Sequence, residues 1–72
     1  MSEVRKSYGE FVDEFNAADK RRIGRVVQNE EMGPMGAYVI ERYEFADGRI
    51  VRFEYEMGGG SFVIEKEKET LE

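Results

Sequence analysis

The hydrophobic residues of this chain change their spacing once. Up to about residue 20 they recur every three or four positions, whereas later they alternate with polar residues. The first pattern predicts one amphipathic helix and the second predicts β-strands. The apolar stripe of the expected helix consists of Tyr8, Phe11, Val12, Phe15 and Ala18.

We expect the helix over residues 7–20. Ser7 is followed three positions later by Glu10, the spacing of a capping box in which each residue satisfies a free amide of the other. Val4 extends the same apolar stripe, so a start at Ser2 stays open. Either start gives a helix with one apolar face to bury.

Strands are expected over residues 21–31, 37–45, 49–57 and 61–67. The break at residues 32–36 contains Gly, Pro and Met, which is typical of a turn, and its flexible methionines also make it a candidate recognition loop. Whether Val26 or Val27 faces the helix stays open, because the first strand does not alternate cleanly.

The turn between the second and third strands can be predicted from register. A two-residue loop would place Phe53 opposite Arg42. A three-residue loop over 46–48, with glycine in the left-handed region, instead places Tyr43 opposite Val51 and gathers the apolar side chains on one face. A one-residue slip would reverse every side chain, so we expect the three-residue loop.

The turn before the last strand is expected at residues 58–59. This loop would pair Tyr55 with Phe62 and Phe53 with Ile64. The alternation then again keeps one apolar face.

The expected fold is α+β, with one N-terminal amphipathic helix on one face of a four-stranded antiparallel meander, in the order 1-2-3-4. Residues 1–70 form one domain, with 66–70 frayed, and 71–72 resemble the remnant of an expression tag. The expected core is Tyr8, Phe11, Val12, Phe15, Ala18, Ile23, Val39, Tyr43, Phe45, Val51, Phe53, Tyr55, Phe62 and Ile64.

Composition excludes several chemistries. The 72 residues include no His and no Cys, so disulfides, thiolate nucleophiles and the commonest metal ligands are absent. The net charge of −5 opposes general affinity for nucleic acid or anionic membranes. No apolar run reaches the roughly 20 residues of a membrane span, and the N-terminus lacks a signal sequence, so we expect a cytoplasmic protein.

The principal candidate site is the face of the sheet that the helix leaves uncovered. One helix is about 10 Å wide, whereas four strands at ~4.8 Å spacing are about twice as broad. Apolar residues among charges on that face indicate a contact surface for a protein partner or a second copy. The residues expected there are Tyr38, Ile40, Arg42, Ile50, Arg52, Glu54, Val63 and Glu65.

A second candidate is a basic cluster. Four cations within six residues, beside a sheet that carries aromatic residues, could contact nucleic-acid phosphates. The same cations also suit a helix C-terminus, where they interact favourably with the helix dipole. The residues are Lys20, Arg21, Arg22 and Arg25.

A third candidate is the acid on the helix-free face. Alternate residues of a strand lie about 6.8 Å apart, so carboxylates would form rows that could imitate a nucleic-acid backbone and occupy a basic site on another protein. Ordinary cross-strand pairs, such as Arg52 with Glu65, are the simpler interpretation. The acidic residues are Glu44, Glu54, Glu56, Glu65 and Glu67.

Catalysis finds no support in the pattern. There is no phosphate-binding loop, calcium loop or glycosylation acceptor. We therefore expect a non-catalytic interaction module without cofactor, metal or small-molecule substrate. Nucleic-acid binding and acidic inhibition of another protein are the alternatives.

Overall fold

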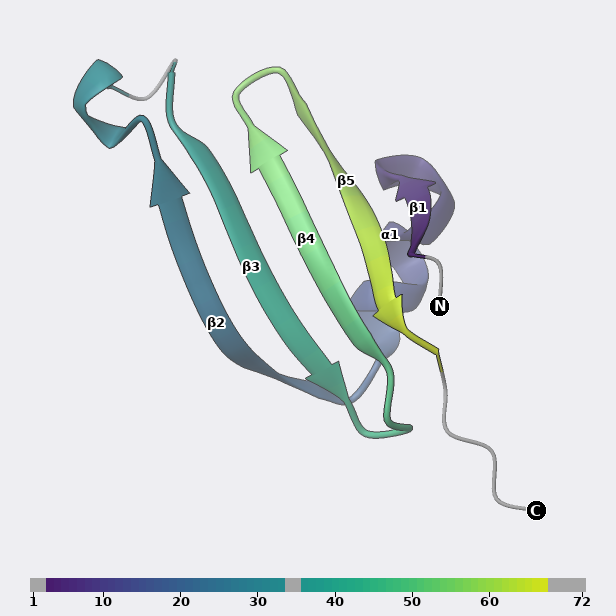
Figure 1. Cartoon of the computed structure of the whole chain (residues 1–72). Coiled ribbons are helices and arrows are strands. Elements are labelled where there is room, and N and C mark those ends of the chain that lie inside the picture. Colours follow the sequence, from purple (N-terminus) through teal and green to yellow (C-terminus); the bar gives the residue numbers. More distant parts are fainter. Residues whose placement is uncertain (1–2, 34–35, 68–72) are drawn as a thin grey trace.

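The structure is a computed structural model that describes residues 3–33 and 36–67. The described residues form one helix, one 3-10 turn and a single antiparallel sheet of five strands (Figure 1). The elements are β1 (Val4–Ser7), α1 (Tyr8–Ala17), β2 (Lys20–Gln28), η1 (Glu30–Met32), β3 (Tyr38–Phe45), β4 (Ile50–Glu56) and β5 (Gly59–Lys66). The strand order is β1-β5-β4-β3-β2, so β1 and β2 form the two edges.

The α+β class and the antiparallel sheet are confirmed, but the prediction of four strands is wrong. β2 to β5 form the expected meander, and β1 adds a fifth strand beside β5. In that pairing Val4 lies opposite Ile64 and Ser7 opposite Ser61. The alternative helix start at Ser2 is therefore also wrong, because Val4 belongs to a strand.

The capping box is confirmed at the start of α1. The Ser7 hydroxyl accepts a hydrogen bond from the Glu10 amide, and the Ser7 amide donates to the Glu10 carboxylate at 2.7 Å. The helix ends at Ala17 rather than Lys20, since Ala18 has an extended backbone with ψ of 142°. The cations that follow thus belong to β2 and not to the helix C-terminus.

The three-residue turn between β3 and β4 is confirmed. The Phe45 amide donates to the Arg49 carbonyl at 2.8 Å, and Gly48 has a φ of 99°, which glycine adopts without steric cost. Tyr43 lies opposite Val51, as the register predicts.

The predicted register between β4 and β5 is wrong by two residues. Tyr55 lies opposite Gly60 and Phe53 opposite Phe62, so the turn falls at 57–58. The rings of Phe53 and Phe62 stack with centroids 4.6 Å apart. A Cβ on Gly60 would lie only 3.0 Å from the Tyr55 Cβ, so a glycine there gives this register its close approach without crowding.

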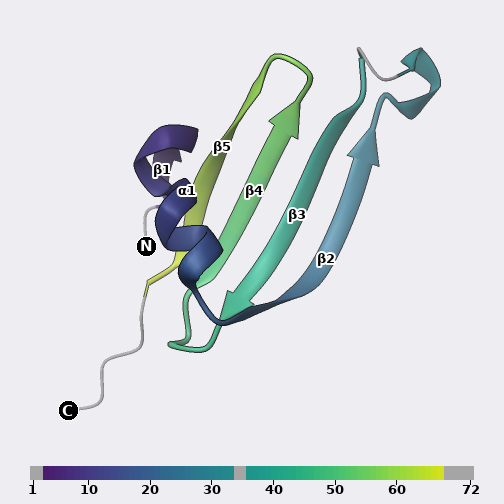
Figure 2. The same ribbon diagram turned by 180° about the vertical axis from the view of Figure 1, so that it is seen from behind.

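The hydrophobic core lies between α1 and one side of the sheet. Figure 2 shows α1 over the β5 and β4 side, while much of β2 and β3 extends beyond it. Tyr8 and Ile23, both expected in the core, are 49% and 40% exposed, so these two predictions are wrong. Tyr8 opens the helix, and Ile23 lies at a bulge on an edge strand. The buried cluster is Phe11, Phe15, Phe45, Val51, Phe62 and Ile64.

Pairing of β2 with β3 resolves the faces of its two valines. Val27 lies opposite Val39, which shares the helix side with Tyr43 and Phe45, and Val26 lies opposite Ile40 on the helix-free face. β2 ends at Gln28, three residues before the predicted end, and leads into η1.

Part of the predicted loop (34–35) and of the predicted frayed tail (68–70), with the presumed tag residues 71–72, lies outside the described residues. Within residues 3–33 and 36–67, no helix has the length and apolar character needed to cross a membrane.

Candidate functional site

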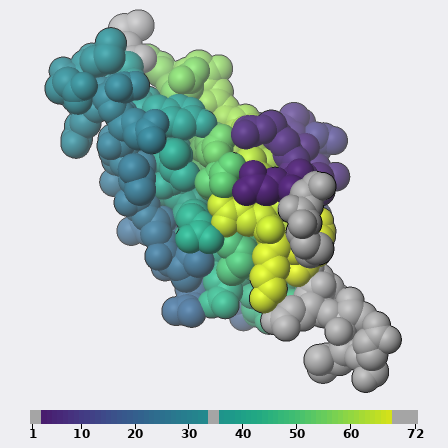
Figure 3. Space-filling model, in the orientation of Figure 1, coloured from purple at the N-terminus to yellow at the C-terminus, as the bar shows by residue number. Residues whose placement is uncertain are grey.

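The helix-free face of the sheet has two unlike halves. Figure 3 shows this face, with β2 and β3 along one side and β1 and β5 along the other. Charged side chains connect β1, β5, β4 and β3, whereas apolar side chains are exposed or half-buried on β2 and β3. These halves are described in turn.

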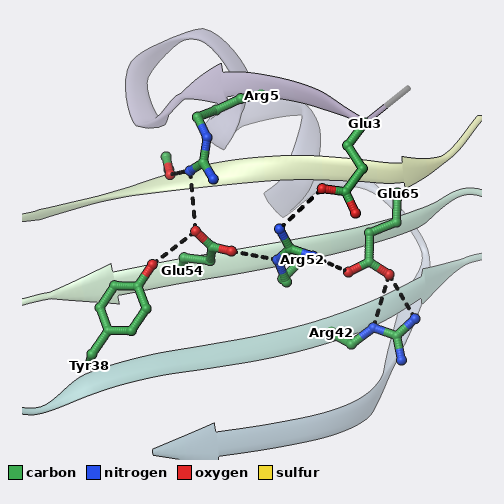
Figure 4. Close-up of polar contacts among 8 residues, drawn as sticks. Glu3, Arg5, Tyr38, Arg42, Arg52, Glu54 and Glu65 are labelled. Carbon is green, nitrogen blue, oxygen red and sulfur yellow. Dashed lines mark hydrogen bonds and ion pairs between the residues drawn. The ribbon is translucent and has the colours of Figure 1, made fainter. Parts of the chain in front are cut away.

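An ion-pair network occupies the first half (Figure 4). It brings together residues from both ends of the chain and from the central strands. Its members are Glu3, Arg5, Tyr38, Arg42, Arg52, Glu54, Ser61 and Glu65.

Arg52 is the centre of this ion-pair network. Its guanidinium donates to Glu54, to Glu65 at 2.7 Å, and to Glu3 at 3.4 Å. Glu54 also accepts from Arg5 at 3.2 Å and from the Tyr38 hydroxyl at 2.9 Å. The predicted Arg52–Glu65 pair is confirmed.

Two carboxylates of the network, Glu54 and Glu65, are ionised and paired with arginines. Burial alone would raise the pKa of Glu54, but hydrogen bonds from Tyr38 and the neighbouring arginines outweigh it and lower that pKa. For Glu65, burial is likewise outweighed by Arg42 and Arg52, and its pKa is lowered. Three arginines face three glutamates in the network, and two of these glutamates, Glu54 and Glu65, belong to the expected acidic rows. Glu44 pairs with Arg21 outside the network.

Val63 lies on the helix-free face as expected, but only 1% of its surface is accessible, so its expected exposure is wrong. Its cross-strand neighbours are Arg5 on β1 and Arg52 on β4. Arginine side chains cover apolar surface with their aliphatic stems while their charged ends stay at the surface. The missed strand β1 thus accounts for the burial of Val63.

The second half carries an apolar strip, which we define as Val26, Ile40 and Tyr38. Val26 is 54% exposed, and Ile40 and Tyr38 are half-buried. The Tyr38 hydroxyl reaches Glu54, so this residue connects the apolar strip to the ion-pair network. Ile50, also expected on this face, is half-buried beside a bulge at the start of β4.

The four cations of the basic cluster lie on β2 but divide between its faces. Arg21 lies on the helix-free side and pairs with Glu44 at 2.6 Å. Lys20 lies on the other side, with its ammonium 4.5 Å from the centre of the Phe15 ring. Arg22 and Arg25 approach the Glu41 carboxylate at 3.8 and 3.3 Å.

Glu41 is a buried carboxylate that the sequence analysis missed. It is 8% exposed on the helix side of β3, and it accepts hydrogen bonds from the Tyr43 hydroxyl at 2.7 Å and the Tyr55 hydroxyl at 3.1 Å. Burial would raise the pKa of Glu41, but these bonds and Arg25 lower it. An acid between Val39 and Tyr43, on the apolar side of a strand, is the signal that could have found it.

Tyr43 donates the shorter of the two tyrosine hydrogen bonds to Glu41. Its burial, followed by its hydrogen bond to the ionised Glu41, raises the pKa of Tyr43 to about 12. The tyrosine therefore stays neutral near pH 7 and serves as a hydrogen-bond donor. The arrangement connects β2, β3 and β4 on the side of the sheet beyond α1.

A wide, open hollow of about 410 Å³ lies where β2 begins and β3 ends. Its lining mixes charges of both signs with one aromatic residue, and the Arg21–Glu44 pair forms part of it. The other lining residues are Asp19, Lys20, Phe45, Ala46 and Gly48.

Neither metal-binding chemistry nor similarity to known proteins assigns a function to these side chains. Among the described residues, no cluster of three or more acidic side chains is arranged to hold a metal ion. The chain matches no protein-family model, no curated protein and no solved structure to a significant degree. The function must therefore be argued from the surface itself.

Proposed function

We propose that this chain is a small non-catalytic interaction module, which binds a protein partner or a second copy through the helix-free face of its sheet. The observation that carries this proposal is the contrast between the two halves of that face. On one half the charges satisfy each other in the ion-pair network, whereas the apolar strip leaves Val26, Ile40 and Tyr38 accessible.

The ion-pair network supports the proposal because it can serve as the polar border of the apolar strip. Its arginines already have carboxylate partners, so a ligand would have to displace those partners before it bound there. Contact surfaces characteristically combine an apolar centre with a polar rim. The apolar strip with the network along one side follows that pattern. The proposal also includes the cytoplasmic location expected from the sequence, with which the cysteine-free composition is compatible.

The test compares the chain with Ile40→Gln and with the matched control Met57→Gln. Met57 is 68% exposed in the turn between β4 and β5 and is not a member of the apolar strip. Binding is measured as self-association by light scattering and as capture of partner proteins by cross-linking. We expect Ile40→Gln to weaken binding about 10-fold while Met57→Gln leaves it unchanged.

Two results would contradict this proposal. One is a chain that stays monomeric at high concentration and captures no protein that depends on Ile40. The other is binding that Met57→Gln weakens as much as Ile40→Gln does. Circular dichroism of each variant confirms that the sheet is intact.

Nucleic-acid binding is the alternative with one supporting observation. Arg22 and Arg25 share the helix side of β2 with the half-buried Tyr43 and Tyr55 on neighbouring strands. Such binding should weaken steeply with salt and disappear in an Arg22→Ala, Arg25→Ala double variant. Binding through the apolar strip should instead tolerate salt, so a salt titration separates the two.

The acidic-inhibitor alternative remains a third proposal. Its acids Glu44, Glu54 and Glu65 already bind arginines of the same chain, so a basic partner must compete with those pairs. Retention of a basic protein that Ile40→Gln does not weaken would favour it.

A further inference from the structure

β2 is unusual among the described strands. It is the longest, with nine residues, yet none of its side chains is buried. It also lies at an edge of the sheet, so one of its sides has no strand beside it. A long edge strand presents unpaired amides and carbonyls that can pair with another chain.

The backbone groups that face this edge follow from the alternation of antiparallel pairing. The Phe45 amide donates to Arg49, and the Ala46 amide donates to the Asp19 carbonyl, each at 2.8 Å. Phe45 therefore points its backbone groups toward β4. Counting back by twos along β3, Glu41 and Val39 also point toward β4.

Their partners on β2 must then point the other way. Arg25 lies opposite Glu41 and Val27 opposite Val39. Residues opposite each other without mutual hydrogen bonds direct their amides and carbonyls outward. Arg25 and Val27 consequently offer two donors and two acceptors at the open edge of the sheet.

Only the second half of this edge strand is free of bulges. A bulge between Arg22 and Gly24, together with the preceding cations, protects the first half against pairing. Residues 24–28 contain no bulge in the β2–β3 pairing, no proline and a single charge, on Arg25. The segment open to a partner strand is therefore 24–28.

We propose that two copies of this chain pair antiparallel through residues 24–28 of β2, which joins their sheets into one continuous sheet. This proposal goes beyond the proposed function, because it uses the edge of β2 rather than the helix-free face, and it names a second copy as the partner. A two-fold axis perpendicular to the sheet keeps each face on its own side. Because opposite residues of an antiparallel pair share a face, the axis must lie between two copies of the same residue. At Val26, the axis places Arg25 beside Val27 of the other copy, and both have outward backbone groups.

The side chains suit this register. Val26 of one copy meets Val26 of the other on the helix-free face, which joins the two apolar strips, whereas an axis at Arg25 would oppose two guanidiniums. Antiparallel pairing also brings the basic start of β2 beside the acidic residues Glu30 and Glu31, which follow the partner's β2. Opposite charges thus meet at both ends of the paired segment.

The first test removes the outward amide of Val27. Val27→Pro deletes a donor that β3 does not use, and Val27→Thr is the matched control that keeps the amide and the β-branched shape. We expect the dissociation constant of the dimer, from light scattering across concentrations, to rise about 10- to 100-fold in Val27→Pro only, since two hydrogen bonds are lost by symmetry.

The second test leaves β2 unchanged. Glu30→Lys with Glu31→Lys places cations beside Lys20, Arg21 and Arg22 of the partner, so we expect weaker dimerisation that partly recovers at high salt. In the unaltered protein, the Arg25 and Val27 amides should exchange more slowly with deuterium as protein concentration rises.

Three outcomes would overturn edge pairing. A dimer of Val27→Pro as tight as the original shows that the edge is not used. If Ile40→Gln disrupts the dimer and Val27→Pro does not, the two copies associate through their faces. That result supports the proposed function but not this inference. A chain that is monomeric throughout excludes a second copy, and Ile40-dependent capture of another protein would then still uphold the proposed function.

Discussion

The side of the sheet formed by β1, β5 and β4 is held together differently from the side formed by β2 and β3. On the first side, α1 covers one face and the ion-pair network covers much of the other, and Phe62 and Val63 are almost inaccessible to solvent. On the second side, β2 buries no side chain. Its tertiary contacts include the backbone ladder with β3, ion pairs to Glu41 and Glu44, and the ammonium of Lys20 over the Phe15 ring.

The comparison teaches where stability and binding are separated in this small chain. Burial of apolar surface is the main favourable contribution to folding, so the first side carries most of the stability. The second side can expose its edge and its apolar strip without loss of the core. The predictions below test that division, in order of decreasing effect.

The largest effect is expected for Phe62→Ala. Phe62 is fully buried, and its ring lies 4.8 Å from that of Phe15, so its truncation leaves a cavity in the core. We expect a loss of about 3–5 kcal/mol in the free energy of unfolding, measured by urea titration. Val27→Ala on β2 should cost less than about 1 kcal/mol. Equal losses would contradict the division.

The next effect compares two glutamates of the helix-free face. Glu54→Ala removes the acceptor of Tyr38 and of two arginines from a buried position, and we expect a loss of about 2 kcal/mol in unfolding free energy. Glu44→Ala breaks an exposed pair with Arg21 and should cost less than about 1 kcal/mol. A reversed order in urea titration would show that the network does not stabilise the fold.

Acid should weaken the first side. The pKa values of Glu54 and Glu65 are lower in the folded chain than their ordinary value of 4.5, so their stabilisation is present above that pH. It is lost as the pH falls through the lowered values, by an amount on the order of 1 kcal/mol for each carboxylate. Urea titrations at neutral and acidic pH measure the loss, which should be smaller in Glu54→Gln. An equal loss in that variant would assign the effect elsewhere.

Alkali should act on the second side through Tyr43. Its pKa of about 12 lies above the ordinary value of 10.0, so the folded chain keeps this proton longer than the unfolded chain does. Stability should therefore decrease between pH 10 and about pH 12. Near-ultraviolet absorbance should show a tyrosinate transition near pH 12 that Tyr43→Phe removes and Glu41→Gln moves to lower pH. An unchanged transition in Glu41→Gln would separate Tyr43 from that carboxylate.

Local sequence patterns correctly predicted the elements that depend on contacts between residues close together in the chain. The Ser7–Glu10 capping box and the three-residue turn at Gly48 depend on residues a few positions apart, and both are confirmed. β1 escaped prediction because four residues with one apolar member, Val4, show no alternation of their own. Its partner β5 lies some sixty positions away.

The β4–β5 register shows the limit of periodicity. Because side chains on a strand repeat every two residues, a shift by two keeps the same apolar face, and the pattern cannot distinguish the two registers. Ring stacking of Phe53 on Phe62 and the close approach at Gly60 decide between them. The candidate site changed for a different reason: the missed strand β1 buries Val63 and supplies Arg5 to Glu54.

The sequence by itself determined the single helix with its cap, the antiparallel meander, the apolar side of β3, β4 and β5, and the absence of thiol and imidazole chemistry. These features depend on residue type and on spacing along the chain. Only the tertiary structure decided that β1 adds an edge strand beside β5, that Glu41 and Glu54 are buried among hydrogen-bond donors, and that β2 forms the other edge. Those features depend on contacts between residues distant in the chain, whose free energy exists only once the sheet has formed.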